Sequence, residues 1–390
     1  MENSVKKVLI TLLLLLSQNM VVAETFQDLI NHHLKQYSQL ENFSAIQVSI
    51  KAGELKHYVA GTKNLAPGSA KITPTDLFDV GSITKSFTAA LAVMAEADGK
   101  LQLNETVGHY LSEYPHWGNI SLTGLLNMST GIPNYSDSPT INYLLAKNLR
   151  QYWEPEELIG LAYPKQVNPP RKAGYFYSNT GYVLLDIILT KQYKMPFKQL
   201  LQDKIIKPLD LKNTFYPVPD YSKDVLDRLV HGYSYNIYDN PELLGQDVTE
   251  NNLSWAGAAG AIVANSDDVV YWIENLFIND KILSQAQKNT IQKLISVSTG
   301  KSIKKTNSKD PRGFGLGIIQ GYEPETGNYW FYEGKTLGYR AFYLYVPCNK
   351  VIIAALFNSA TNSQNDHGGE LMLGLYHEVV KQNETLVCKS

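Results

Sequence analysis

Cysteine is scarce in this sequence, which holds only Cys348 and Cys388 among its 390 residues. Two cysteines cannot build a disulfide-rich scaffold, and they exclude a cysteine-rich zinc or iron–sulfur site. In an exported protein these two thiols could form one disulfide, whereas the alternative is a pair of buried free thiols. The sequence alone does not choose between the two states.

An excess of charge of either sign is also absent. The 35 Lys and Arg residues nearly balance the 37 Asp and Glu residues, which leaves a formal net charge of -2. This balance excludes a nucleic-acid binder that works through bulk electrostatics, and it excludes a disordered acidic tail. With 44% hydrophobic residues, the chain is long enough to bury a large core, in one large domain or two interleaved ones.

The one continuous apolar run lies near the start of the chain and is short. Lys6 and Lys7 precede the apolar residues 8–16, and Val21-Val22-Ala23 follows with small or medium side chains at the expected cleavage positions. This pattern predicts a secretory signal peptide over residues 1–23, because the run is too short to span a bilayer. We therefore expect a secreted or periplasmic protein, residues 24–390, without a membrane span.

The spacing of apolar residues predicts an α+β chain. The predicted strands are 45–51, 56–61, 314–320, 328–332, 340–346 and 351–357. The predicted helices are 26–37, 82–98, 122–128, 182–193, 197–206, 267–277, 285–296 and 370–381. The Lys- and Ser-rich segment 299–312 predicts a mobile surface loop.

This order of elements predicts one antiparallel β-sheet flanked by the N-terminal and C-terminal helices. Two early strands and three or four late strands would form the sheet. We therefore expect a sheet region of about residues 24–72 and 313–390, and a large, mostly helical insertion of about residues 73–312.

Several common catalytic motifs are missing from the sequence. It contains no Gly-x-Ser-x-Gly, which disfavours an α/β-hydrolase, and no His-Glu-x-x-His zinc motif. Gly300-Lys301-Ser302 and Gly334-Lys335-Thr336 end like a phosphate loop, but both lack the glycine that opens this motif five residues before the second glycine. No metal ion or organic cofactor is expected.

The main candidate for chemistry is the segment Ser82-Ile83-Thr84-Lys85, at the start of the predicted helix 82–98. Serine and lysine three residues apart share one helix face, and the helix N-terminus favours developing negative charge. A lysine accepts the serine proton only when burial or a nearby cation lowers its pKa. The alternative is a capping serine beside an exposed lysine. The same spacing also occurs at Ser4–Lys7, Ser298–Lys301 and Ser302–Lys305.

Two further segments carry groups that could complete a site. Tyr177-Ser178-Asn179 precedes the predicted helix 182–193, where a phenol could relay a proton and a carboxamide could hold a substrate carbonyl or N–H. A helix cap after a core aromatic is the alternative. Residues 332–339 (YEGKTLGY) lie in the strand-rich region, where glycines would let an acyl substrate lie against an edge strand. A β-turn between two strands fits the same glycines.

These three elements, in this order, resemble the motifs of the penicillin-recognising serine hydrolases. The nearest branch looks like the group of D-alanyl-D-alanine carboxypeptidases, class C β-lactamases and related esterases, and the resemblance covers nearly the whole mature chain. The similar segments are 77–88 (LFDVGSITKSFT), 125–133 (LLNMSTGIP), 176–182 (FYSNTGY), 255–261 (WAGAAGA) and 314–317 (FGLG). Thr130 departs from the family's LLxHxSGxP stretch.

The resemblance implies a β-lactamase/transpeptidase-like fold and a role for each matching residue. Ser82 would be the acylated nucleophile, Lys85 its proton partner, and Tyr177 the phenol that passes a proton to the leaving group. Asn179 would bind the substrate amide, and the backbone N–H groups of Ser82 and Lys335 would form the oxyanion hole. The substrate-binding residues would be Asn179, Tyr332, Gly334, Lys335 and Thr336.

The third motif departs from the family pattern, which usually opens with Lys or His and ends with Gly. Here the equivalent triplet is Tyr332-Glu333-Gly334, so a phenol replaces the usual cation. Lys335 comes one residue after this triplet and would point to the face of a strand opposite to Tyr332. Reading Lys335-Thr336 as the motif would put Leu337 in the place of glycine, so we prefer the first alignment. Because a cation here normally attracts a substrate carboxylate, carboxylate-bearing peptides and β-lactams should bind less well.

We therefore expect an exported serine hydrolase that acts through an acyl-enzyme on Ser82, most similar to a D-alanyl-D-alanine carboxypeptidase. The alternatives are a β-lactamase or carboxylesterase of the same family, or a catalytically weak homologue that binds peptidoglycan or a partner protein. The expected substrates are a peptidoglycan stem peptide, a β-lactam or an ester, and no nucleic-acid partner is expected.

Overall fold

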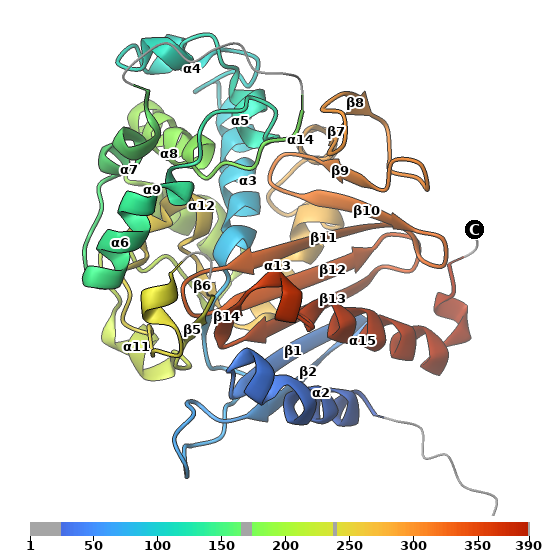
Figure 1. The fold of residues 1–390 in the computed structure, drawn as a ribbon. Helices are drawn as coiled ribbons and strands as arrows, with labels where there is room; N and C mark the ends of the chain where they lie inside the picture. The colour runs from blue at the N-terminus through green and yellow to red at the C-terminus, as the bar shows by residue number, and fades with distance from the viewer. Residues whose placement is uncertain (1–24, 165–173, 237–239, 389–390) are drawn as a thin grey trace, which may run out of the picture.

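The computed structural model describes residues 25–164, 174–236 and 240–388. The signal peptide predicted over residues 1–23 lies outside the described residues. Figure 1 shows a large β-sheet with helices on both of its faces and a mostly helical region beside it. The predicted α+β class is confirmed.

The large sheet is antiparallel and has nine strands. In spatial order they are β2 (Glu54–Gly61), β1 (Ala45–Ala52), β13 (Val351–Phe357), β12 (Arg340–Val346), β11 (Gly327–Lys335), β10 (Ile319–Glu323), β9 (Arg312–Phe314), β7 (Leu294–Ser296) and β8 (Ser302–Ile303). Because β1 pairs with β13, the first two strands of the chain share one sheet with its late strands, as the sequence predicted.

Helices cover both faces of this sheet (Figure 1). α2 (Phe26–Glu41) and α15 (Gly368–Gln382) pack on one face, and α13 (Ser266–Phe277) packs on the other. Every residue of β13 is therefore buried. The side chains of Ile353 and Phe357 join the core under α2 and α15, whereas those of Ile352 and Leu356 join the core of the helical region.

The helical region surrounds α3 (Thr84–Ala97), in which every residue from Thr84 to Ala95 is buried. Its small alanine side chains allow neighbouring helices to approach closely. The other helices of this region are α4 (Val107–Tyr110), α5 (Leu122–Leu126), α6 (Pro139–Lys147), α7 (Pro155–Ala162), α8 (Thr180–Tyr193), α9 (Phe197–Leu201), α10 (Lys207–Leu209), α11 (Lys223–Arg228), α12 (Gly257–Gly260) and α14 (Gln285–Ile291).

The helical insertion is shorter than predicted, because β7, β8 and the first residue of β9 precede residue 313 yet belong to the large sheet. The helix predicted over 285–296 ends at Ile291, and the chain continues as β7. The segment 299–312, predicted as a mobile loop, contains β8, which pairs with β7 at the sheet edge. Short apolar runs do not distinguish helix from strand, which explains the error over 285–296.

Two small sheets lie outside the large one. β3 (Phe78–Asp79), β6 (Val263–Ala264) and β4 (Thr214–Phe215) form one, and β14 (Ser359–Thr361) and β5 (Tyr233–Tyr235) form the other. Strand β3 of the three-stranded sheet ends at Asp79, three residues before Ser82. Its pairing with β6 therefore holds in place the backbone that leads to the candidate nucleophile.

Cys348 and Cys388 are joined by a disulfide, with their Cα atoms 5.8 Å apart. The bond ties the C-terminal segment to the turn between β12 and β13. The structure thus adopts one of the two states that the sequence left open.

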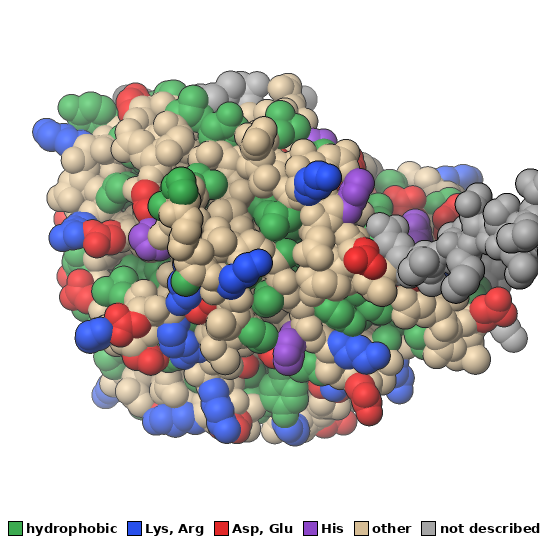
Figure 2. Space-filling model, turned by 90° about the horizontal axis from the view of Figure 1, so that it is seen from below, with side chains coloured by type: hydrophobic (Ala, Val, Ile, Leu, Met, Phe, Trp, Pro, Cys, Tyr) green, Lys and Arg blue, Asp and Glu red, His purple; other side chains and the backbone are tan. Residues whose placement is uncertain are grey.

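The surface seen in Figure 2 carries interspersed Lys, Arg, Asp and Glu side chains, and neither sign of charge forms a continuous patch on this face. In the part of the chain that the structure describes, no helix has the length and apolarity needed to cross a membrane.

Candidate active site

Ser82 lies in the 3-10 turn η1 (Gly81–Ile83), which leads directly into α3. Gly81 has a φ of +51°, a conformation that glycine adopts without strain. Because Lys85 follows three residues later on the same helical face, its Nζ lies 3.0 Å from the Oγ of Ser82. The turn therefore presents the hydroxyl at the start of a helix, beside an amine.

The amine of Lys85 is fully buried and holds two hydrogen bonds. It donates to Ser82 Oγ at 3.0 Å and to the carbonyl oxygen of Ala259 at 2.8 Å. Its Nζ also lies 5.0 Å and 5.4 Å from the ring centroids of Tyr177 and Tyr182. Burial without a paired carboxylate among the described residues lowers the pKa of Lys85 well below its usual value. A neutral amine that can accept a proton is therefore favoured.

Tyr177 approaches Ser82 from the loop before α8, and the two hydroxyl oxygens lie 2.6 Å apart. The side chain of Tyr177 is 38% exposed, yet loss of solvent around it raises the pKa of its phenol to about 12, against an opposing contribution from the Ser82 hydrogen bond. The phenol thus holds its proton at neutral pH. Lys85, Ser82 and Tyr177 form one continuous chain of hydrogen bonds.

The segment around residues 127–134 holds the Tyr177 loop in place. The carbonyl of Met128 accepts from the N–H of Phe176 at 2.7 Å, and the carbonyl of Pro133 accepts from the hydroxyl of Ser178 at 3.2 Å. The side chain of Asn134 accepts from the N–H of Asn179 at 2.9 Å. The stretch that resembles LLxHxSGxP therefore acts as a support for the second motif.

Asn179 lines the same cavity as Ser82 but contacts neither Ser82 nor Lys85 through an observed hydrogen bond. Its amide nitrogen donates to the Oγ of Ser136 at 2.9 Å. Its Oδ1 is buried and has no hydrogen-bond partner among the described residues. The carboxamide thus retains an unused acceptor beside the cavity.

The third motif lies on β11, which runs past the nucleophile turn. Tyr332 and Gly334 are buried, and the ammonium of Lys335 donates to the carbonyl of Thr361. The hydroxyl of Thr336 donates to the buried carboxylate of Asp79 at 2.9 Å. The two alignments of the motif, which open with Tyr332 or with Lys335, are thus physically distinct, because these residues lie on opposite faces of β11.

Two cavities meet at Ser82. The first, of about 270 Å³, is lined by Ser82, Tyr177, Asn179, Lys335 and Thr336 together with mostly polar neighbours. The second, of about 360 Å³, contains Ser82 and Tyr177 again, with Tyr332 and Lys335. Of the residues singled out in the sequence, Lys85 and Gly334 lie behind the cavity walls.

Sequence reasoning missed several residues that line the first cavity, among them Asn134, Ser136, Asp137 and Asn240. The polar run that follows Pro133 was the available signal for three of them. The carbonyl of Ala259 was also missed as a partner of Lys85, because a backbone group carries no sequence signature. In the described part of the chain, no group of three His, Cys, Asp or Glu side chains could hold a metal ion.

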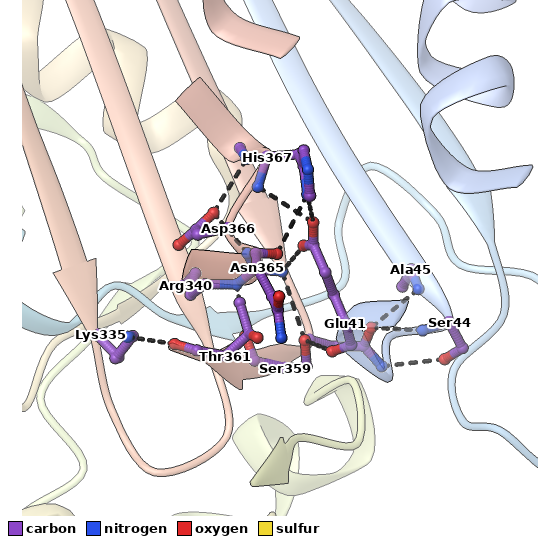
Figure 3. A network of polar contacts seen from close by, with 12 residues as sticks. Glu41, Ser44, Ala45, Lys335, Arg340, Ser359, Thr361, Asn365, Asp366 and His367 are labelled. Carbon is purple, nitrogen blue, oxygen red and sulfur yellow. Dashed lines mark hydrogen bonds and ion pairs between the residues drawn. The ribbon is translucent and has the colours of Figure 1, made fainter. Parts of the chain in front are cut away.

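A buried network of ion pairs supports the end of β11 (Figure 3). The guanidinium of Arg340 donates to the carboxylates of Glu41 and Asp366, each at 2.6 Å. Arg340 and Glu41 are fully buried, and each offsets the other's desolvation. The network joins the end of α2 to the start of β12, beside the contact between Lys335 and Thr361.

A model of one protein family matches residues 43–374, which is most of the chain, and that family is Beta-lactamase. The chain belongs to the β-lactamase family. The resemblance found in the motifs is confirmed, and the chain is a β-lactamase-family serine hydrolase.

Curated relatives of this β-lactamase-family chain are distant. A β-lactamase of Providencia stuartii is 25% identical over 92% of this chain and 94% of its own length. A penicillin-binding protein of Bacillus subtilis is 24% identical over 71% of this chain, and the chain spans 60% of that relative's length.

Solved structures share the fold of this family member. A D-amino acid amidase from Ochrobactrum anthropi SV3 superposes with a TM-score of 0.74 at 20% identity, covering 92% of this chain and 98% of that one. A β-lactamase/D-alanine carboxypeptidase from Pseudomonas syringae superposes with a TM-score of 0.69 at 18% identity, covering 92% and 99%. The expected β-lactamase/transpeptidase-like fold is thus confirmed.

Proposed function

We propose that this protein hydrolyses an amide or ester bond through an acyl-enzyme on Ser82. The observation that carries the proposal is the hydrogen-bonded chain from the buried Lys85 amine through Ser82 Oγ to the Tyr177 hydroxyl. A hydroxyl becomes a nucleophile when a neighbour takes its proton, and the lowered pKa of Lys85 supplies such a neighbour.

In the proposed reaction, the neutral amine of Lys85 takes the proton of Ser82 while Oγ bonds to the substrate carbonyl carbon. The carbonyl π electrons move onto its oxygen, which the N–H groups of Ser82 and Lys335 stabilise. Tyr177 then gives its proton to the leaving nitrogen or oxygen as its bond to carbon breaks. The Lys85 ammonium returns a proton to the phenolate, and water repeats the sequence to release the acyl group.

Within this chemistry, a D-alanyl-D-alanine carboxypeptidase-like activity is the first candidate. The names of two relatives support it: a penicillin-binding protein and a β-lactamase/D-alanine carboxypeptidase. Such substrates carry a free carboxylate next to the scissile bond, and Asn179 with its unused acceptor would hold the peptide N–H.

A second candidate is an esterase or amidase whose substrates lack that carboxylate. The specific observation in its favour is Tyr332, a neutral phenol at the position where the family usually has a cation. Lys335 lines the cavity too, but it lies three residues further along β11, on the opposite face of the strand, and its ammonium donates to Thr361, so it does not take the position of that cation. The third candidate, from a different class, is a weakly catalytic homologue that binds peptidoglycan or a partner protein.

Labelling of Ser82 tests the shared chemistry. The purified protein should gain the mass of one fluorophosphonate group, Ser82→Ala should gain none, and Ser284→Ala, a helix cap outside the cavity lining, should label like the wild type. Labelling that persists in Ser82→Ala would reject the nucleophile.

A substrate panel then separates the candidates. A carboxypeptidase releases D-alanine from diacyl-D-Ala-D-Ala, a β-lactamase turns over nitrocefin, and an esterase turns over only the nitrophenyl ester. A binding homologue turns over none of them and retains cell-wall fragments.

We also propose that the protein is exported to the periplasm or the medium. It rests on the leader pattern of residues 1–23 and on the Cys348–Cys388 disulfide, which persists in oxidising compartments. N-terminal sequencing of protein recovered from the periplasm or medium should begin at Glu24, and a chain that keeps residues 1–23 would contradict it.

A further inference from the structure

Tyr332 has a buried hydroxyl without a partner. Its side chain is 3% exposed, and its oxygen makes no hydrogen bond with the described residues. Leaving a buried hydroxyl unpaired costs about 1–3 kcal/mol, which phenylalanine at this position would avoid. A partner that forms only during the reaction would account for the hydroxyl.

The residues around Tyr332 indicate that this partner is Tyr177. Its ring packs edge-on against Phe314, with centroids 6.1 Å apart, and it faces the cavity that also contains Ser82 and Tyr177. A hydrogen-bonding contribution from Tyr332 lowers the pKa of Tyr177, so the two hydroxyls lie near each other, although no hydrogen bond of ordinary length joins them. Burial raises the pKa of Tyr332 itself well above its usual value, so Tyr332 keeps its proton as a donor.

The proposed reaction creates a need for such a donor. When Tyr177 passes its proton to the leaving group, its oxygen becomes a phenolate in surroundings that disfavour charge, as its raised pKa shows. The ammonium of Lys335 is directed to Thr361. The hydroxyl of Tyr332, which has no hydrogen-bond partner among the described residues, lines the same cavity as Tyr177. Like the amine of Lys85, it can donate a hydrogen bond that stabilises the phenolate.

We propose that Tyr332 is a positioning residue whose hydroxyl donates a hydrogen bond to the Tyr177 oxygen while Tyr177 protonates the leaving group. The proton of Tyr332 stays on Tyr332, and only the proton of Tyr177 is transferred. This inference rests on the proposed acyl-enzyme function. It assigns to Tyr332 a role toward Tyr177, in place of the substrate-binding role that the resemblance implies.

The role predicts a dependence on the leaving group. A poor leaving group needs the proton of Tyr177, whereas a good one departs without it. Two esters with the same acyl group, phenyl acetate and p-nitrophenyl acetate, therefore separate this role from a general disturbance of the site.

Tyr343 provides a matched control. It lies directly opposite Tyr332 on β12, is 1% exposed, and also has a hydroxyl without a partner among the described residues. It lines neither cavity that contains Ser82. Tyr332→Phe and Tyr343→Phe each delete one unpaired buried hydroxyl, so both should fold and melt at or above the wild-type temperature.

The experiment measures kcat/KM of the three proteins on both esters. Tyr332→Phe should lose about 10- to 100-fold on phenyl acetate and less than about threefold on p-nitrophenyl acetate. Tyr343→Phe should match the wild type on both. Equal losses on the two esters, or no loss on phenyl acetate, would overturn the role of Tyr332.

Fluorophosphonate labelling keeps the two proposals apart. A wild type that does not label at Ser82 refutes the acyl-enzyme function and this inference with it. A wild type that labels at Ser82, with Tyr332→Phe and Tyr343→Phe equal on both esters, refutes only the inference.

Discussion

The backbone of Gly334 packs against the backbone of Ser82 so closely that a Cβ on residue 334 would lie 3.0 Å from the Ser82 nitrogen and 1.9 Å from the carbonyl oxygen of Val80. From the other side, a Cβ on Gly81 would lie 2.5 Å from the nitrogen of Lys335. Two glycines thus let β11 approach the nucleophile turn. This approach is what an oxyanion hole made of the Ser82 and Lys335 N–H groups requires.

Gly334→Ala should therefore damage activity. The added methyl group must displace β11 or the turn, so we expect kcat/KM to fall by at least about 10²-fold and stability to fall by about 1–3 kcal/mol. Ester hydrolysis and urea unfolding measure the two effects. Gly374→Ala in α15 is the control, because nothing lies within 4 Å of its added Cβ, and the variant should be active and slightly more stable. Wild-type activity in Gly334→Ala would exclude the close approach as a requirement.

Lys85→Met should abolish catalysis, because it removes the proposed proton acceptor. We expect a loss of about 10³-fold or more in kcat/KM on an ester. Lys288→Met is the matched control, since Lys288 is equally buried but lines no cavity with Ser82, and it should retain activity. Comparable losses in both variants would indicate a structural effect of deleting any buried lysine.

The stability of Lys85→Met should depend on pH in a defined direction. The folded pKa of Lys85 lies below the usual 10.5, so between those values the unfolded chain binds more protons and wild-type stability rises with pH. The methionine variant lacks this pH-dependent contribution to stability, because methionine does not titrate. Its advantage in free energy of unfolding should therefore shrink as pH rises from 7 toward 10, as urea titrations would show; a constant difference would contradict the lowered pKa.

Asp79→Asn should stabilise the protein more at pH 8 than at pH 5. Burial raises the pKa of Asp79 to about 7 from 3.8, so the folded state holds a proton that the unfolded state releases, and stability falls as pH rises through this window. Asparagine removes that loss and can still accept from Thr336. Each pKa unit corresponds to about 1.4 kcal/mol, so the gain at pH 8 should be a few kcal/mol. Urea unfolding at both pH values measures it, and a gain independent of pH would argue against a protonated Asp79.

Glu41→Gln should destabilise the fold by about 3–5 kcal/mol, because it leaves the buried Arg340 guanidinium without one of its two carboxylate partners. The double variant Glu41→Gln with Arg340→Met should lose less than the sum of the two single variants. A double-mutant cycle by chemical denaturation gives this coupling. Strict additivity would mean that the pair does not act as a unit.

Much of the fold follows from local sequence patterns. The predicted bounds of β12 and β13 coincide with the observed ones, because runs of β-branched and aromatic residues between turn residues carry the strand signal by themselves. The pairing of early and late strands followed from the similar style of the two regions. β7 and β8 were missed because their pairing partners, and not their few residues, make them strands.

Part of the candidate site also follows from local sequence, and part of it depends on the tertiary structure. The sequence alone placed an amine beside a hydroxyl, since Ser82 and Lys85 are three residues apart on one helix, and it named the segments that carry Tyr177 and Gly334. Only the tertiary structure decided that Lys85 is sealed from water against the carbonyl of Ala259, and that the hydroxyl of Tyr332 is left unpaired. Those features depend on contacts between segments far apart in the chain. Local periodicity specifies which face of an element is buried, but not which distant groups it meets there.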